Sequence, residues 1–227
     1  RLELEQIDFD VREVFDHVAR LLGEQARGKE LELLVDVDPG LPAVLRGDPT
    51  RLTQVLTNLA SNAVKFTERG QVVLTAGAEN GPDGRVLLHV DVRDTGIGID
   101  PRRLPELFER FTQGDASTTR IHGGTGLGLA ISREIVTALG GELTVHSESG
   151  AGSTFSFTVP CEPPEVEPAP SADDRARERL AGRRVLVLDG RPARARVLVH
   201  HLARWGLEVD LVADEAAARA AVARGTT

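Results

Sequence analysis

The sequence predicts an α/β protein in two domains, on three observations. Over residues 9–161, helices of helical hydrophobic period alternate with strands of period two. Residues 162–182 are proline-rich and acidic, which is typical of a solvated linker. Residues 183–227 then follow the order strand, helix, strand, helix, which favours a parallel sheet.

End signals and periodicity place the elements of the first domain. Residues 8–29 are expected to form an amphipathic helix, with Asp10 and Glu13 in capping-box spacing. Asp48 and the proline after it start a helix that runs to about Phe66. Further helices are expected over residues 100–111 and 127–139. Strands of alternating hydrophobicity are expected over residues 30–38, 71–79, 85–94, 141–149 and 152–160.

The composition limits the core, the partners and the location. Hydrophobic residues make up 41% of the 227 residues but aromatic residues only 4%, so the core must be mostly Leu, Val and Ala. The net charge of -8 argues against nucleic acid or a membrane surface as a partner. A single cysteine, Cys161, excludes an internal disulfide and indicates a reducing, cytoplasmic location. Because the chain has no methionine and opens in helix-like sequence, we expect it to be a piece of a longer protein.

A polar stripe runs along the helix that begins after Asp48. At about 100° per residue, Arg51, Asn58, Asn62 and Lys65 fall within roughly 40° of one line, beside the apolar face. Carboxamide oxygens can ligate Mg²⁺, and a lysine can contact phosphate. The stripe therefore indicates a Mg²⁺–phosphate site, and the alternative is a solvated polar face.

Two glycine-rich stretches carry the rest of the predicted site. Asp94 ends a strand, and Gly96 and Gly98 follow it at once. A carboxylate there can accept from the exocyclic amine of adenine, and the alternative is an ordinary turn. The stretch HGGTGLGLAIS brings glycines and free backbone N–H groups to a helix start, which is typical of an anion site. The alternative for this stretch is a flexible loop.

In this order, the stretches resemble the ATP-binding catalytic domain of sensor histidine kinases, in the GHKL superfamily. NLASNAVKF resembles the N box, DTGIGI the first glycine box, LFERF the F box and GGTGLGLAIS the second glycine box. GSTFSFTVP resembles the final strand. The resemblance covers Phe9 to Pro160 and implies the Bergerat fold, an α/β two-layer sandwich of mixed sheet with helices on one face.

The resemblance also implies ATP and Mg²⁺ as cofactors. Asn62 would ligate Mg²⁺, Asn58 and Lys65 would contact the phosphates, and Asp94 would bind the adenine amine. Residues 112–124 would form a mobile lid. Arg110 would meet the charge of the γ-phosphate, and further nucleotide contacts would come from Gly96, Gly98, Thr125, Gly126, Leu127, Gly128 and Thr154.

Asn58 separates two activities within the superfamily. The ATP-hydrolysing branches, of the gyrase, mismatch-repair and heat-shock chaperone types, carry Glu where Asn58 stands. A carboxylate there can take a proton from water, whereas a carboxamide cannot. We therefore expect a histidine kinase that keeps its γ-phosphate for a histidine. The alternative is a silent scaffold in which ATP only sets the conformation.

A phosphoacceptor histidine is expected elsewhere in the protein. None of the six histidines lies in the His-Glu/Asp motif of the family, and His122 falls in the lid. Residues 1–8 resemble the connection that follows the family's dimerisation helices. Expected partners are these upstream helices, in a homodimeric parent protein whose membrane anchor, if it has one, lies in segments outside this chain. A receiver domain or response regulator is also expected as a partner.

The second domain resembles the first half of a flavodoxin-like receiver. Its strands are expected over residues 183–190 and 207–213, and its helices over residues 194–206 and 214–225. Receivers end their first strand with two adjacent acids that hold Mg²⁺, but this chain has Asp189 followed by Gly190. With one carboxylate lost, Mg²⁺ should bind poorly. We therefore expect a pseudo-receiver, and the alternative is a genuine receiver that tolerates Gly190.

Overall fold

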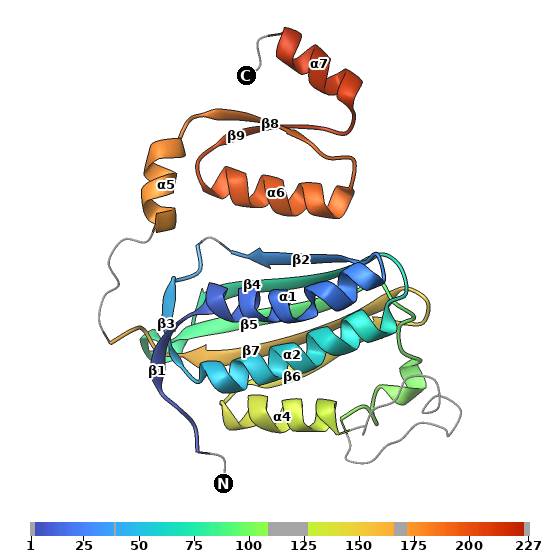
Figure 1. Ribbon diagram of the computed structural model, residues 1–227. Helices are drawn as coiled ribbons and strands as arrows, with labels where there is room; N and C mark the ends of the chain where they lie inside the picture. The colour runs from blue at the N-terminus through green and yellow to red at the C-terminus, as the bar shows by residue number, and fades with distance from the viewer. Residues whose placement is uncertain (1–2, 39, 109–126, 166–171, 225–227) are drawn as a thin grey trace. The chain divides into compact units, whose positions relative to one another are not determined.

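Figure 1 shows the computed structural model of the chain, which describes residues 3–38, 40–108, 127–165 and 172–224. The chain divides into two compact units, and each is described by itself. The first comprises Arg1–Val37 and Ala43–Glu165, and the second comprises Asp38–Pro42 and Val166–Thr227. Within the described ranges, none of the helices combines the length and the hydropathy needed to cross a bilayer.

A five-stranded mixed sheet forms one layer of the first unit, with strand order β2-β4-β5-β7-β6. The strands are β2 (Glu32–Val37), β4 (Gln71–Asn80), β5 (Val86–Asp94), β6 (Glu142–Glu148) and β7 (Gly152–Cys161). Only the β2–β4 pair is parallel, and the other three pairs are antiparallel. The turn η1 (Pro82–Gly84) connects β4 and β5, as its NGPDG sequence indicates.

Three helices form the second layer and cover one face of this sheet (Figure 1). They are α1 (Val11–Gly28), α2 (Pro49–Phe66) and α4 (Gly128–Ala138). Alternate strand residues turn to the helices. The core between the layers includes the fully buried side chains of Phe15, Leu56, Leu59, Leu74, Leu88 and Phe157. The predicted two-layer α/β fold is therefore confirmed.

Side-chain caps set where α1 and α2 begin. Asp10 accepts from the backbone N–H of Arg12 at 2.8 Å, and Asp48 accepts from that of Arg51 at 2.8 Å. Each carboxylate satisfies a donor that the first helical turn leaves unpaired. Asp48 is 5% exposed, so the cap that orients α2 is buried. Both predicted N-caps are confirmed, although residues 8–10, which were expected within the first helix, lie before its first residue, Val11.

The structure differs from the sequence expectation in three respects. β1 (Ile7–Asp10) and β3 (Val44–Gly47) form an antiparallel ribbon that was not predicted. In place of the predicted helix over residues 100–111, the described part has the 3₁₀ turn η2 (Pro101–Arg103) and further turns up to Phe108. Pro105 explains this, because it has no N–H to donate to the carbonyl of Pro101. The predicted linker contains a helix, α5 (Ala172–Leu180).

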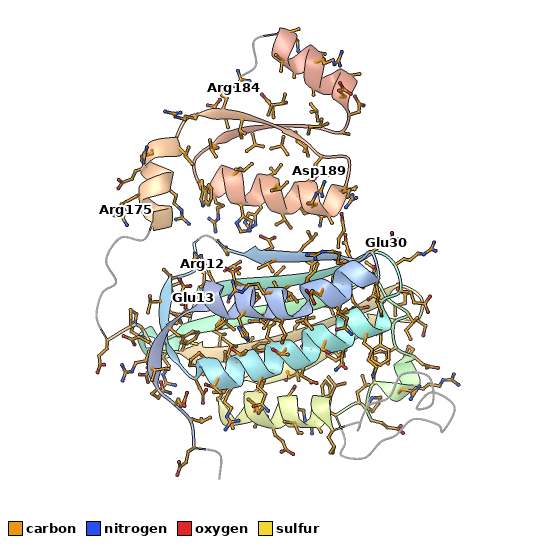
Figure 2. All side chains as sticks on the ribbon, in the orientation of Figure 1. Arg12, Glu13, Glu30, Arg175, Arg184 and Asp189 are labelled. Atoms are coloured by element: carbon orange, nitrogen blue, oxygen red, sulfur yellow. The ribbon has the colours of Figure 1, made fainter. Side chains whose placement is uncertain are left out.

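The second unit has the predicted strand–helix–strand–helix order. Its further elements are β8 (Arg184–Leu188), α6 (Pro192–Arg204), β9 (Glu208–Val212) and α7 (Glu215–Ala223). The two strands pair in parallel. Arg184 Nη2 and Asp210 Oδ2 lie 2.9 Å apart across them, and Asp189 follows the end of β8 (Figure 2).

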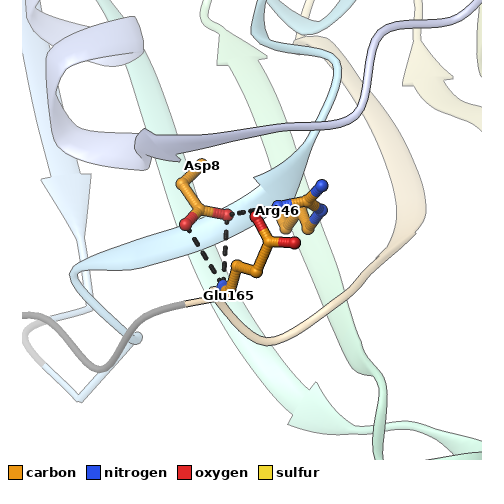
Figure 3. Close-up of polar contacts among 3 residues, drawn as sticks. All are labelled: Asp8, Arg46 and Glu165. Carbon is orange, nitrogen blue, oxygen red and sulfur yellow. Dashed lines mark hydrogen bonds and ion pairs between the residues drawn. The ribbon is translucent and has the colours of Figure 1, made fainter.

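A three-residue ion cluster joins the two ends of the first unit (Figure 3). Arg46 Nη1 on β3 lies 2.7 Å from Glu165 Oε2 and 3.4 Å from Asp8 Oδ1 on β1. The backbone N–H of Glu165 also donates to Asp8. A backbone bridge between Arg46 and Glu162 runs beside this cluster. The segment that enters the unit and the segment that leaves it are therefore fixed to the same ribbon.

Candidate functional site

The predicted polar stripe lies on α2 beside the core. Asn58, Asn62 and Lys65 are half-buried. The apolar side of the helix is buried through Leu52, Val55, Leu56, Leu59, Ala60, Ala63 and Val64. The helix thus holds two carboxamides and an ammonium at the border between the core and solvent, as its periodicity indicates.

Asn58 is held in place by α4. Its Nδ2 donates to Ser132 Oγ at 2.9 Å, and Ser132 is 2% exposed. A Cβ added at Gly128 would lie 2.4 Å from Asn58 Oδ1, so any other residue at the start of α4 would have to displace this carboxamide. Ser132 was not predicted as a site residue. Its position four residues after Gly128, on the same face of the helix, could have indicated that it lies near the site.

Asn62 and Lys65 complete the stripe. Within the described ranges, the Asn62 carboxamide makes no side-chain hydrogen bond. Lys65 Nζ lies 5.0 Å from the centroid of the Phe66 ring, in a cation–π contact. Among the described residues, the Asn62 carboxamide therefore has no side-chain hydrogen-bond partner, and Lys65 lies beside the neighbouring aromatic ring.

Asp94 is a buried carboxylate at the end of β5. It is 6% exposed and accepts from the backbone N–H of Gly96 at 2.8 Å. Val90 and Val92 are buried on the same face, so alternation turns Asp94 toward the helical layer. Burial raises the pKa of Asp94, and hydrogen bonds from Gly96 and Ser153 partly offset that rise.

The loop after Asp94 requires both of its glycines. A Cβ at Gly96 would lie 2.4 Å from the carbonyl oxygen of Phe66, at the end of α2. Gly98 has a φ of 65°, and a Cβ there would lie 1.9 Å from the carbonyl oxygen of Glu148. The backbone is therefore clamped between α2 and the β6–β7 turn, with Asp94 at the head of the loop.

The structure does not bring Thr154 to this site. Thr154 pairs with the exposed Arg93, on the sheet face opposite the helices. The residue before it, Ser153, is 7% exposed and hydrogen-bonds to Asp94. Because strand side chains alternate, a shift of one residue decides the face. Ser153, rather than Thr154, therefore lies beside Asp94.

Several predicted site residues lie outside the described residues. These are Arg110, Thr125, Gly126, His122 and the lid over residues 112–124. Leu127 is described, and its carbonyl accepts from the N–H of Ile131 in the first turn of α4. The residues on either side of that gap, Phe108 and Leu127, are both half-buried.

The donor set suits Mg²⁺ bound together with phosphate. Among the described residues, no group of three or more His, Cys, Asp or Glu side chains could hold a metal by itself. Mg²⁺ usually takes only one or two protein ligands, with water and substrate phosphates as the others. The oxygen of Asn62 fits that requirement, and Mg²⁺ there would shield the charge of the phosphates.

The raised pKa of Asp94 makes its replacement informative. In the unliganded protein the ionised Asp94 carboxylate destabilises the folded state. This destabilisation is absent below the unfolded pKa of the group and becomes complete as the pH rises through its raised folded pKa. Asp94→Asn should therefore be at least as stable as the parent at pH 7 by chemical denaturation. Its ATP affinity should fall by about 10- to 150-fold, for a lost hydrogen bond to a charged group of about 1.5–3 kcal/mol.

Calorimetry between pH 4 and pH 8 checks this prediction. The affinity gap between parent and Asp94→Asn should narrow toward low pH, where the parent carboxyl is also neutral. A variant with parental ATP affinity at pH 7 would remove Asp94 from the site.

The two-layer fold, with Gly96 and Gly128 packed against α2, agrees with a class of ATP-binding domains. Residues 47–163 match the family described as "Histidine kinase-, DNA gyrase B-, and HSP90-like ATPase". The match covers just over half of the chain, and the chain belongs to this family.

Curated relatives are long histidine kinases. The chain is 38% identical over 209 residues to the signal transduction histidine-protein kinase BarA of Escherichia coli strain K12. It is 40% identical over 211 residues to the sensor histidine kinase GacS of Pseudomonas protegens. Each match covers 92% of this chain and 22% of the relative, so the chain spans about a fifth of their length.

Two solved structures agree with the fold. Full-length ShkA in complex with AMPPNP is 33% identical, with a TM-score of 0.79 over 96% of this chain and 43% of that one. The nucleotide-free catalytic domain of the histidine kinase ThkA is 27% identical, with a TM-score of 0.59 over 70% of this chain and 97% of that one.

Proposed function

We propose that the first unit is the ATP-binding catalytic part of a hybrid sensor histidine kinase. It transfers the γ-phosphate of ATP to a histidine on dimerisation helices. The carrying observation is Asn58, a neutral carboxamide anchored to Ser132 where an ATPase needs a carboxylate base. The names of BarA and GacS and the AMPPNP in the ShkA complex support this proposal.

In this proposal each described residue has one role. Asn62 holds Mg²⁺, and Asn58 and Lys65 contact phosphate oxygens. Asp94 accepts from the adenine amine, and Ser153 keeps that carboxylate in place. The remaining contacts are proposed for Gly96, Gly98, Arg110, Thr125, Gly126, Leu127 and Gly128. Asn62 would hold Mg²⁺ against the phosphates, where the ion would supply positive charge that stabilises them.

Calorimetry and a phosphate-release assay test the proposal on this chain. It should bind ATP in a Mg²⁺-dependent manner and hydrolyse it very slowly, because Asn58 stands where the ATP-hydrolysing branches carry a carboxylate base. Rapid turnover would place the chain with the ATP-hydrolysing branches instead. Tight binding with no transfer to any histidine would support the alternative, a nucleotide-binding scaffold.

We further propose that the parent protein is a cytoplasmic homodimer that signals to a receiver domain or response regulator. In this proposal residues 183–227 form a degenerate receiver segment. Arg194 supports the degeneracy, because its Nε and Nη2 lie 2.5 and 3.1 Å from the two oxygens of Asp189. The Asp189 side chain is 3% exposed, and this guanidinium keeps its pKa below the ordinary value. An internal cation thus stands where a receiver would hold Mg²⁺.

Trp205, the single tryptophan of the chain, offers a probe of this unit. Mg²⁺ up to about 10 mM should not change its fluorescence, because Arg194 already neutralises the one carboxylate. Gly190→Asp combined with Arg194→Ala should restore a saturable Mg²⁺ response, whereas Gly190→Asp alone should not. A saturable response in the parent chain would show a working receiver site.

A further inference from the structure

Lys29 meets the end of α2 with all three of its donors. It is the residue after α1, and its side chain is half-buried. Its Nζ donates to the carbonyl oxygens of Val64 at 2.8 Å, Lys65 at 2.8 Å and Thr67 at 3.2 Å. An ammonium has three N–H bonds, so this one ion is fully used by a single stretch of backbone.

Each of the last four carbonyls of α2 accepts a hydrogen bond from a residue that the structure describes. The last four carbonyls of a helix have no partner within the helix, and they form its negative end. The carbonyl of Ala63 accepts from the N–H and the hydroxyl of Thr67. The carbonyl of Phe66 accepts from the N–H of Ile97 at 3.4 Å. Lys29 supplies the partners of the rest, and its charge is of the stabilising sign there.

This helix end is also a wall of the nucleotide site. The last turn of α2 bears Lys65, and its Phe66 carbonyl is the point on which the loop after Asp94 rests. The backbone of that loop packs closely against the helix end, because a Cβ at Gly96 would lie 2.4 Å from the same carbonyl oxygen. A small displacement of the helix end must therefore move the loop.

We infer that Lys29 is a positioning residue for the nucleotide site. It fixes the last turn of α2 and, through Phe66, the backbone of the loop that shapes the adenine pocket. It does so from outside the pocket. This inference assumes the proposed function for its nucleotide readouts, whereas the coupling between Lys29 and the loop can be tested without nucleotide.

Three variants and one control separate positioning from general stability. Lys29→Met keeps the length of the side chain and removes the charge, whereas Lys29→Arg keeps the charge. Lys29→Gln keeps two donors without charge and replaces the Met variant if that does not fold. Arg27→Met is the control, because Arg27 is an exposed cation of the same helix end.

Amide hydrogen exchange gives the first readout, well below the melting temperature of each variant. Lys29→Met should speed exchange at residues 95–98 by about 10-fold or more, while exchange in the core strand β5 stays parental. Lys29→Arg should recover most of the protection, and Arg27→Met should match the parent. Parental exchange at residues 95–98 in Lys29→Met would overturn the inference, as would uniform acceleration over the whole unit.

Nucleotide affinity gives the second readout. Lys29→Met should bind ATP about 10-fold more weakly, and its preference for ATP over GTP should narrow, because the loop beside Asp94 is no longer held. Unchanged ATP affinity and preference in the Met variant would overturn the positioning role. Absence of ATP binding by the parent chain would instead refute the proposed function, and exchange at residues 95–98 would still decide the coupling.

Discussion

With dimerisation helices of the histidine kinase family joined ahead of Arg1, the chain should incorporate label from γ-labelled ATP, whereas the chain alone should not. The chain has the proposed ATP site, but none of its six histidines lies in the acceptor motif. Joined helices give the γ-phosphate a nucleophile at an effective concentration of about the millimolar range. At micromolar concentration, the same helices added in trans should be labelled about 100-fold more slowly or worse.

The label should be stable to base and labile to acid, as a phosphoramidate is. Replacing the acceptor histidine of the joined helices with alanine should abolish it, while ATP binding stays unchanged. Labelling of the unjoined chain would point to an acceptor that the sequence reading missed. Unlabelled helices, despite demonstrated ATP binding, would favour the scaffold alternative.

Asn62→Ala should lose nearly all Mg²⁺-dependent ATP affinity, while the unliganded chain remains as stable as the parent. The carboxamide makes no side-chain hydrogen bond within the described ranges, so its removal leaves no buried partner unpaired. Alanine also has the higher helix propensity, by up to about 0.7 kcal/mol. The lost ligand should cost about 1.5–3 kcal/mol or more of binding free energy.

Calorimetry with and without Mg²⁺ identifies the role of Asn62. In excess EDTA the parent and Asn62→Ala should bind ATP with similar weakness, because the metal that Asn62 holds is absent from both. Asn80→Ala provides a matched control, since Asn80 is an exposed carboxamide at the end of β4. An equal loss with and without Mg²⁺ would make Asn62 a phosphate contact rather than a metal ligand.

Local periodicity accounts for what could be predicted. The stripe of Asn58, Asn62 and Lys65 depends on the repeat of one helix, and the caps at Asp10 and Asp48 depend on adjacent residues. The order of the strands in the five-stranded sheet and of the long helices α1, α2 and α4 follows in the same way, as does the order in the second unit. These features require no knowledge of distant contacts, and the structure contains them where they were expected.

Two predictions failed although the local sequence contained the information needed to correct them. Thr154 was placed one residue too far, although the buried Phe155 and Phe157 already assign Ser153 to the core face. Pro105 should have limited the helix predicted over residues 100–111.

Other features depend on distant partners. The β1–β3 ribbon pairs segments that are far apart in the sequence, which propensity cannot predict. Lys29 was visible as one of only two lysines, but its role depends on the carbonyls of another helix.

The cluster of Asp8, Arg46 and Glu165 bears on how the first unit can be connected within a longer chain. Because it holds the incoming and outgoing segments at one corner, the first unit behaves as a cassette whose two attachment points coincide. A cassette of that kind can be inserted into a longer polypeptide, or exchanged for another, without spreading its neighbours apart. The loop-closure cost of such an insertion grows only slowly with the length of the inserted chain.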